Sequence, residues 1–173
     1  MPEPATPQRP DLADELLRRM EADQHARGIR NDGPNAAPDW HKAHVVDAAN
    51  LAALQRIIDE HGWPGHALVG EQAANAAWLI AQHGELDFQL RALALLDAAV
   101  KAGDALPRQH AMLTDRCLMR QGQPQIYGTQ YQDTGDGRGM HLWDVTEPET
   151  LDTRRAEVGL DTLAEQEARR TAQ

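Results

Sequence analysis

Five stretches of the chain place apolar residues three and four positions apart, the pattern of an amphipathic helix. They cover about residues 12–27, 43–61, 66–82, 86–102 and 108–120. The stretch 66–82 is the most apolar, because its segment AANAAWLIA carries no charge. We therefore predict that 66–82 is a buried central helix, against which the other helices pack.

The pattern changes after residue 122. Residues 125–131 and 140–145 are rich in β-branched and aromatic side chains, and the turn-forming sequence DTGDGRG lies between them. This arrangement predicts a β-hairpin over about 124–146, followed by one or two helices over about 149–171. The predicted fold class is mainly α, a bundle of five to six helices with one β-hairpin.

The chain has 173 residues, which is typical of one domain. Four prolines and no apolar run in residues 1–10 predict a disordered leader, and residues 11–171 are expected to form a single helical domain.

Composition excludes several classes of partner. Asp and Glu number 27 against 17 Lys and Arg, so the net charge is −10. Nucleic acids and anionic membranes bind clustered basic charge, so neither is expected as a partner. The single cysteine permits no intramolecular disulfide, and no apolar run approaches the length of a membrane span. We expect a cytoplasmic protein, and its oligomeric state stays open.

The apolar stripe of the first helix runs into two charged residues. Positions 12, 16, 20, 23 and 27 share one face, and the last two are Asp23 and Arg27. Their separation of four residues suits an ion pair. Either this end of the helix emerges into water, or the pair points into a cavity.

The stripe of the 66–82 helix ends in a histidine. Val69, Ala73, Ala76 and Ile80 continue by the same spacing to His83, and Gln82 lies beside it. An imidazole at the end of an apolar helix suits general acid–base chemistry. The alternative is that His83 caps the last carbonyl groups of the helix.

Polar residues in the second half of the chain extend this set. Asp115 and Arg116 interrupt the apolar face of the 108–120 helix, while Tyr127 and Gln130 belong to the predicted hairpin. The sequence contains none of the common motifs for zinc, phosphate or nucleophilic catalysis, so no metal and no cofactor are expected.

Several of these residues fall in motifs that resemble a bacterial family known as domain of unknown function 6624. The resemblance covers about residues 12–165 and implies that the polar positions belong together, but it brings no activity, substrate or cofactor. That family tends to have Ala-Asp after Gln-His, whereas this chain has Gly84-Glu85. The motifs that carry the resemblance are Asp23-Gln24 with Arg27, Gly62-Trp63-Pro64, Gly70, Trp78, Gln82-His83, Gln89, Asp115-Arg116, Gln125, Tyr127-Gly128-Thr129-Gln130, Arg154-Arg155 and Gly159-Leu160.

Two hypotheses follow for function. In the first, the protein is an enzyme that carries out hydrolysis or proton transfer on a small polar or anionic substrate. His83 is the acid or base, and Asp115 or Glu85 orients it. The substrate-binding set is Asp23, Arg27, Gln82, Arg116, Tyr127 and Gln130. In the second hypothesis, the same cluster belongs to a non-catalytic module, where it binds a ligand or partner or forms a structural network.

Overall fold

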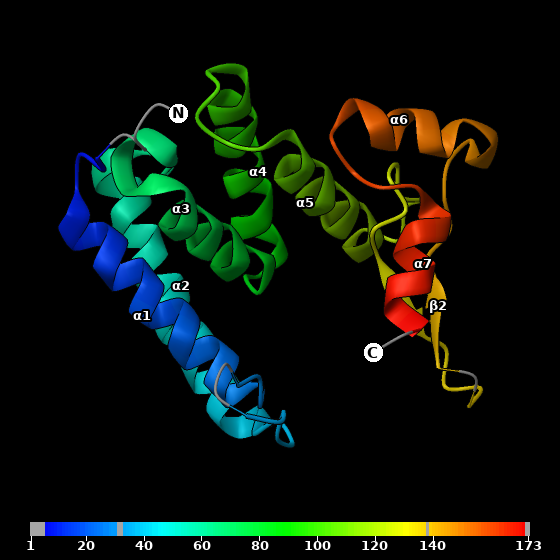
Figure 1. Ribbon diagram of the computed structural model, residues 1–173, viewed down its shortest axis with the longest axis horizontal. Coiled ribbons are helices and arrows are strands. Elements are labelled where there is room, and N and C mark those ends of the chain that lie inside the picture. The colour runs from blue at the N-terminus through cyan, green and yellow to red at the C-terminus, as the bar shows by residue number, and fades with distance from the viewer. Residues whose placement is uncertain (1–5, 31–32, 138, 172–173) are drawn as a thin grey trace. The chain divides into compact units, whose positions relative to one another are not determined.

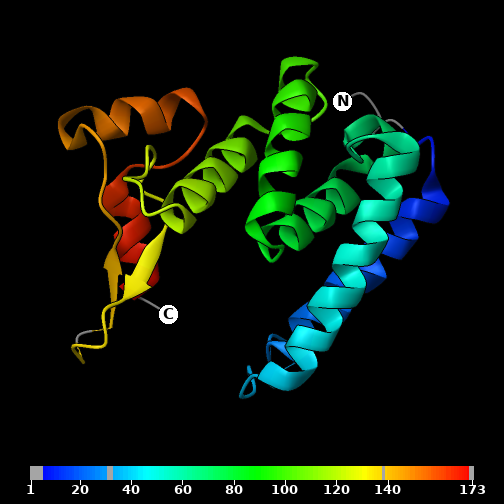
Figure 2. The ribbon, with the colours of Figure 1, turned by 180° about the vertical axis from the view of Figure 1, so that it is seen from behind.

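A computed structural model describes residues 6–30, 33–137 and 139–171. Within these residues the chain is mainly helical, with seven α-helices, one 3-10 helix (η1) and a two-stranded antiparallel sheet (Figures 1 and 2). This confirms the predicted mainly α fold with a late hairpin. In chain order the elements are α1 (Pro10–Ala26), α2 (Trp40–His61), α3 (His66–Gln82), α4 (Leu86–Lys101), α5 (Pro107–Arg120), β1 (Tyr131–Asp133), β2 (Met140–Leu142), η1 (Pro148–Thr150), α6 (Leu151–Glu157) and α7 (Leu163–Thr171).

The chain divides into two compact units. The first extends to Ala105 and contains α1–α4, and the second begins at Leu106 and contains α5–α7 with the hairpin. The single domain expected over 11–171 stays a prediction. Residues 1–5 of the expected leader lie outside the described residues, whereas the N–H groups of Gln8 and Arg9 donate to Ala67 O and Leu68 O.

Two details of the predicted fold need correction. The described residues form seven α-helices rather than five to six, because five helices precede the hairpin and the segment after residue 148 forms two, separated near Gly159, whose φ is +73°. The hairpin is also shorter than 124–146. Its ladder covers only 131–133 and 140–142, with an isolated bridge between Gln125 and Val145. The backbone of residues 126–129 bonds elsewhere, as described below.

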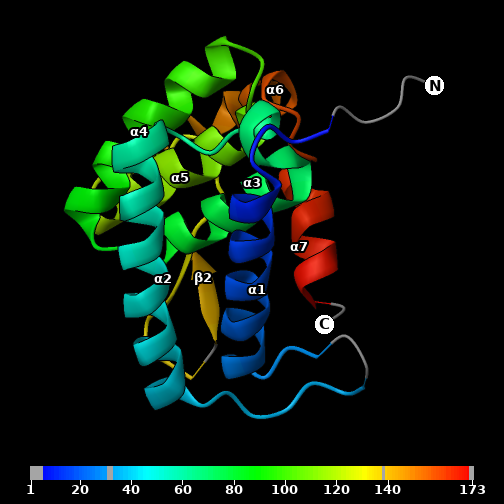
Figure 3. The ribbon, with the colours of Figure 1, turned by 90° about the vertical axis from the view of Figure 1, so that its left-hand side faces the viewer.

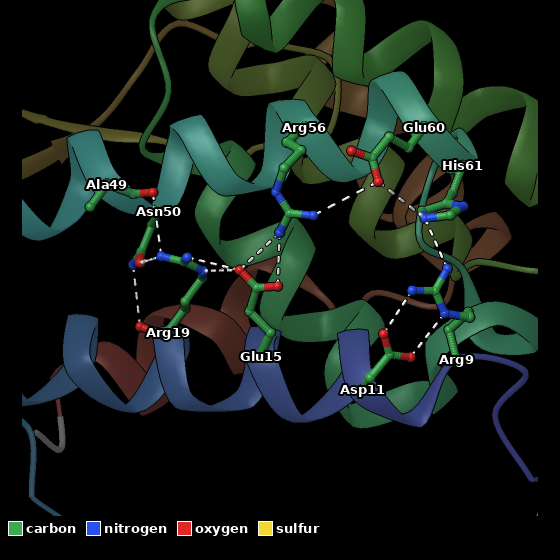
Figure 4. A network of polar contacts seen from close by, with 9 residues as sticks. All are labelled: Arg9, Asp11, Glu15, Arg19, Ala49, Asn50, Arg56, Glu60 and His61. Atoms are coloured by element: carbon green, nitrogen blue, oxygen red, sulfur yellow. Dashed lines mark hydrogen bonds and ion pairs between the residues drawn. The ribbon is translucent and has the colours of Figure 1, made fainter.

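In the first unit, α1 and α2 lie side by side and are joined by the loop after α1 (Figure 3). Charged residues connect the two helices along their length (Figure 4). Glu15 accepts hydrogen bonds from Arg19 on its own helix and from Arg56 on α2. Buried Asn50 donates to Arg19 O, so the seam between the helices is polar as well as apolar.

Helix α3 packs against α1, α2 and α4 in the first unit. Small side chains on it, including Ala73, Ala76 and Ala77, are buried and allow neighbouring helices to approach closely. Its first turn is set apart by Gly70, whose φ of +80° is not helical. Whether α3 is central to all the helices stays a prediction.

The membrane prediction can be compared with the described helices. None of them is both long enough and apolar enough to cross a bilayer.

Candidate functional site

In the first unit, the ends of α1 and α3 bring charged residues to His83. His83 follows the last residue of α3, while Asp23 lies in the last turn of α1 and Arg27 directly follows it. Because α1 packs against α3, these ends meet, and the second turn of α2 adds Asp47. We call these four residues the His83 cluster.

The Nδ1 atom of His83 is the centre of the contacts. It lies 2.9 Å from Arg27 Nη2, 3.3 Å from Asp23 Oδ1 and 3.6 Å from Asp47 Oδ1. Arg27 in turn contacts both carboxylates, since its Nη2 lies 2.7 Å from Asp47 Oδ1 and its Nε lies 3.1 Å from Asp23 Oδ1. The cluster therefore holds two carboxylates, one guanidinium and one imidazole.

The four side chains differ in exposure. Asp23 is 6% exposed, whereas 29% of the His83 side chain is exposed. Burial raises the pKa of Asp23, but His83 and Arg27 beside it outweigh that cost, and the pKa lies below its ordinary value. Asp23 is therefore a buried, ionised carboxylate facing a partly exposed imidazole.

The geometry gives His83 a partner for Nδ1 in either tautomer. A guanidinium can only donate, so the contact from Arg27 requires an unprotonated Nδ1 and places the ring proton on Nε2. A protonated Nδ1 would instead face Asp23 Oδ1 and leave Nε2 as an acceptor. Within the described part of the chain, the polar contacts of the His83 ring are made by Nδ1 and not by Nε2.

Three of the predicted site residues, Asp23, Arg27 and His83, are thus brought together, and the first two form the predicted ion pair. Asp47 was missing from the predicted set. No local signal connects Asp47 to Arg27, which lies 20 residues earlier in the chain. Within the first unit, Asp23 and Asp47 face Nδ1. That Asp115 orients His83 stays a prediction.

Two other predicted residues of the first unit lie next to His83 in the chain. Gln82 is buried, and its backbone carbonyl accepts a hydrogen bond from Gln89 Nε2. Glu85 is exposed and occupies the N-cap position of α4. Their proposed roles in substrate binding and in orienting His83 stay predictions.

Asp115 belongs to the second unit, where it organises a loop. Its carboxylate is fully buried and accepts hydrogen bonds from the N–H groups of Ile126, Tyr127 and Thr129 and from the hydroxyl of Thr129. Burial nevertheless outweighs these bonds, and the pKa of Asp115 is raised. Because the N–H groups of this loop donate to Asp115, residues 126–129 do not extend the hairpin ladder.

Arg155 binds the same loop through its carbonyl groups. It is 1% exposed and donates to Tyr127 O and Gly128 O, with further bonds to Asp161 O and Gln166 Oε1. The loop is therefore held by a carboxylate through its N–H groups and by a guanidinium through its carbonyl groups. Gln130 is also buried, and it exchanges hydrogen bonds with Gln125.

The remaining predicted residues of the second unit are half-buried. Burial lowers the pKa of Arg116 and raises that of Tyr127. The predicted set is thus divided between the units, since Asp115, Arg116, Tyr127 and Gln130 lie in the second and the other five in the first.

The structure also contains a surface groove between α1 and α2. Its lining includes Arg18, Arg19 and Asn50 but not His83. That the Asp23–Arg27 pair points into a cavity stays a prediction.

Comparison with known families matches residues 10–170 to DUF6624, which is described as a family of unknown function. The chain belongs to this family. No curated protein and no solved structure shows significant similarity to the DUF6624 chain. Membership confirms the resemblance found in the sequence and adds no activity.

Proposed function

We propose that the His83 cluster is the functional site and that it carries out acid–base chemistry on a small polar substrate. The observation that supports this proposal is the position of His83, with Nδ1 against Asp23 and Arg27 and part of the ring exposed. Asp23 would favour the tautomer whose Nε2 accepts a proton, and Arg27 the tautomer whose Nε2 donates one. Hydrolysis or proton transfer is the corresponding reaction class.

The charge of the cluster bears on the substrate. Two carboxylates face one guanidinium, so with a neutral imidazole the cluster carries one net negative charge. Arg27 is already paired with both carboxylates and is not free to hold an anion. These charges favour a neutral or cationic substrate over an anionic one. The proposal keeps the expected cytoplasmic location. The net charge of −10 supports the expectation that neither nucleic acid nor an anionic membrane is a partner.

A ligand screen tests the proposal. The thermal midpoint of the wild-type chain is measured in EDTA against small amines, amides, esters and hydroxylated metabolites. We expect at least one compound to raise the midpoint of the wild type and to leave His83→Ala unchanged. His44→Ala is the matched control, because His44 is an exposed histidine on α2 outside the cluster.

The same screen can contradict the proposal. If no compound shifts the wild type while His83→Ala and His83→Gln both unfold, the cluster is a structural network. That outcome would favour the non-catalytic hypothesis, in which these residues only hold three helices together.

A further inference from the structure

The donor atoms of the His83 cluster are spaced like the ligands of one metal ion. Asp23 Oδ1 and Asp47 Oδ1 lie 3.3 and 3.6 Å from His83 Nδ1. Nitrogen and oxygen ligands bond to zinc at about 2.0–2.2 Å, so two ligands of the same ion lie roughly 3–3.5 Å apart. Asp23, Asp47 and His83 each offer one ligand atom, and all three atoms lie within 4.8 Å of one another.

A second observation points to a ligand at Asp23 Oδ1. Asp23 is more than nine-tenths buried, and with the His83 ring proton on Nε2 its Oδ1 forms no hydrogen bond, although it faces both His83 and Arg27. The nearest donor, Arg27 Nε, is 3.1 Å away but equally forms no hydrogen bond. A buried carboxylate oxygen is costly when its lone pairs are unsatisfied. A cation bonded to Oδ1 would remove that cost.

The guanidinium of Arg27 now supplies the positive charge at this position. It contacts all three donor residues, so it offsets one of the two negative charges but satisfies Asp23 Oδ1 poorly. We propose that Asp23, Asp47 and His83 bind one divalent transition-metal ion, which replaces the guanidinium of Arg27 between them. The exchange also releases Arg27, a member of the substrate-binding set expected from the sequence.

The donor types select the class of metal. One imidazole nitrogen with two carboxylate oxygens suits Zn²⁺ or Mn²⁺, whereas Mg²⁺ and Ca²⁺ prefer oxygen ligands alone. The inference goes beyond the proposed acid–base function and does not depend on it.

Calorimetric titration of the full, EDTA-stripped chain with Zn²⁺ and with Mn²⁺ tests the inference. We expect one ion per chain, with binding at least about tenfold weaker in Asp47→Asn, because a ligand is lost. Arg27→Gln should bind about tenfold more tightly than the wild type, because a competing cation is removed. Greater affinity in Arg27→Gln is not expected if the cluster is only a structural network.

Two control variants separate this site from other binding. Asp59→Asn removes one negative charge from an exposed residue of α2 outside the cluster and should leave binding unchanged. His141→Gln disrupts an exposed histidine–carboxylate pair in the hairpin and should also have no effect. The inference is overturned if neither the wild type nor Arg27→Gln binds either metal, or if His141→Gln removes the binding. Because the ligand screen is run in EDTA, failure of the metal site leaves the acid–base proposal standing.

Discussion

Single residues in this protein combine burial with charge in two different ways. Asp23 is a buried carboxylate whose Oδ1 forms no hydrogen bond while the His83 ring proton is on Nε2, whereas Asp115 is a buried carboxylate bonded by four donors of one loop. A fully bonded carboxylate is typical of a structural role. A ligand would therefore be stabilised more by the poorly bonded carboxylate of Asp23 than by that of Asp115.

The role of Asp115 leads to a stability prediction. Asp115→Ala leaves the N–H groups of Ile126, Tyr127 and Thr129 without their acceptor, and we expect a loss of about 3 kcal/mol or more in the free energy of unfolding. Urea denaturation measures the loss, and Asp14→Ala, an exposed position on α1, should change it by less than about 0.5 kcal/mol. Unchanged stability of Asp115→Ala would instead favour the catalytic role predicted from the sequence.

At the scale of elements, the helices begin and end where local chemistry requires. Pro10 and Pro107 open α1 and α5, Asp39 caps α2 by accepting from Lys42 N–H, and Gly62 ends α2 with φ +78°. Each is a signal that depends on a few neighbouring residues.

Gly70 is the exception, because it lies within the range of α3 and has φ of +80°. We expect Gly70→Ala to destabilise the chain by about 1–2 kcal/mol, since an L-residue is strained there. The added Cβ would also lie only 3.2 Å from Pro7 Cγ. Thermal denaturation measures the effect, and Gly33→Ala serves as the control because its Cβ would meet no atom within 4 Å. A Gly70→Ala variant as stable as the wild type would show that α3 can adopt a regular first turn.

The docking of α7 on the hairpin is sensitive to acid. The hydroxyl of Tyr131 on β1 donates to Glu167 on α7 at 2.6 Å, and this bond holds the pKa of Glu167 below its ordinary value. A lowered pKa stabilises the fold above the ordinary pKa of Glu, and the contribution is lost as the pH falls through the pKa of the folded state.

Tyr131→Phe tests this link. At pH 6 we expect the variant to be about 1 kcal/mol less stable than the wild type, and at pH 3 the difference should shrink. Urea denaturation at the two pH values measures it, and Glu167→Gln should remove the pH dependence of the difference. A difference that stays constant between pH 6 and pH 3 would assign the effect to packing instead.

At the scale of the whole molecule, two compact units share the predicted functional residues. The expectation of a single domain is testable through the core of the first unit. Leu54 is fully buried there, and Leu54→Ala should cost about 2–5 kcal/mol.

If residues 11–171 are one cooperative domain, this variant should reduce hydrogen-exchange protection equally in α3 and in α5. Exchange measured by mass spectrometry on peptides from the two helices gives the answer. Loss of protection confined to α3 would show two domains that unfold separately.

The sequence by itself determined the helices and the presence of a late hairpin, because helical periodicity, proline starts and glycine ends act over a few residues. It also identified Asp23 and Arg27 as an ion pair, because they continue the apolar stripe of α1. It identified His83 as a candidate site residue, because His83 continues the apolar stripe of α3.

Only the tertiary structure decided which polar residues meet. Asp47 reaches Arg27 and His83 because α1, α2 and α3 pack together, and Asp115 serves the loop 126–129 because its carboxylate is buried against backbone N–H groups. Such contacts depend on packing between segments distant in sequence, so no local pattern contains them. The hairpin is short for the same reason, because N–H groups of residues 126–129 donate to the buried carboxylate of Asp115 instead of bonding across the ladder.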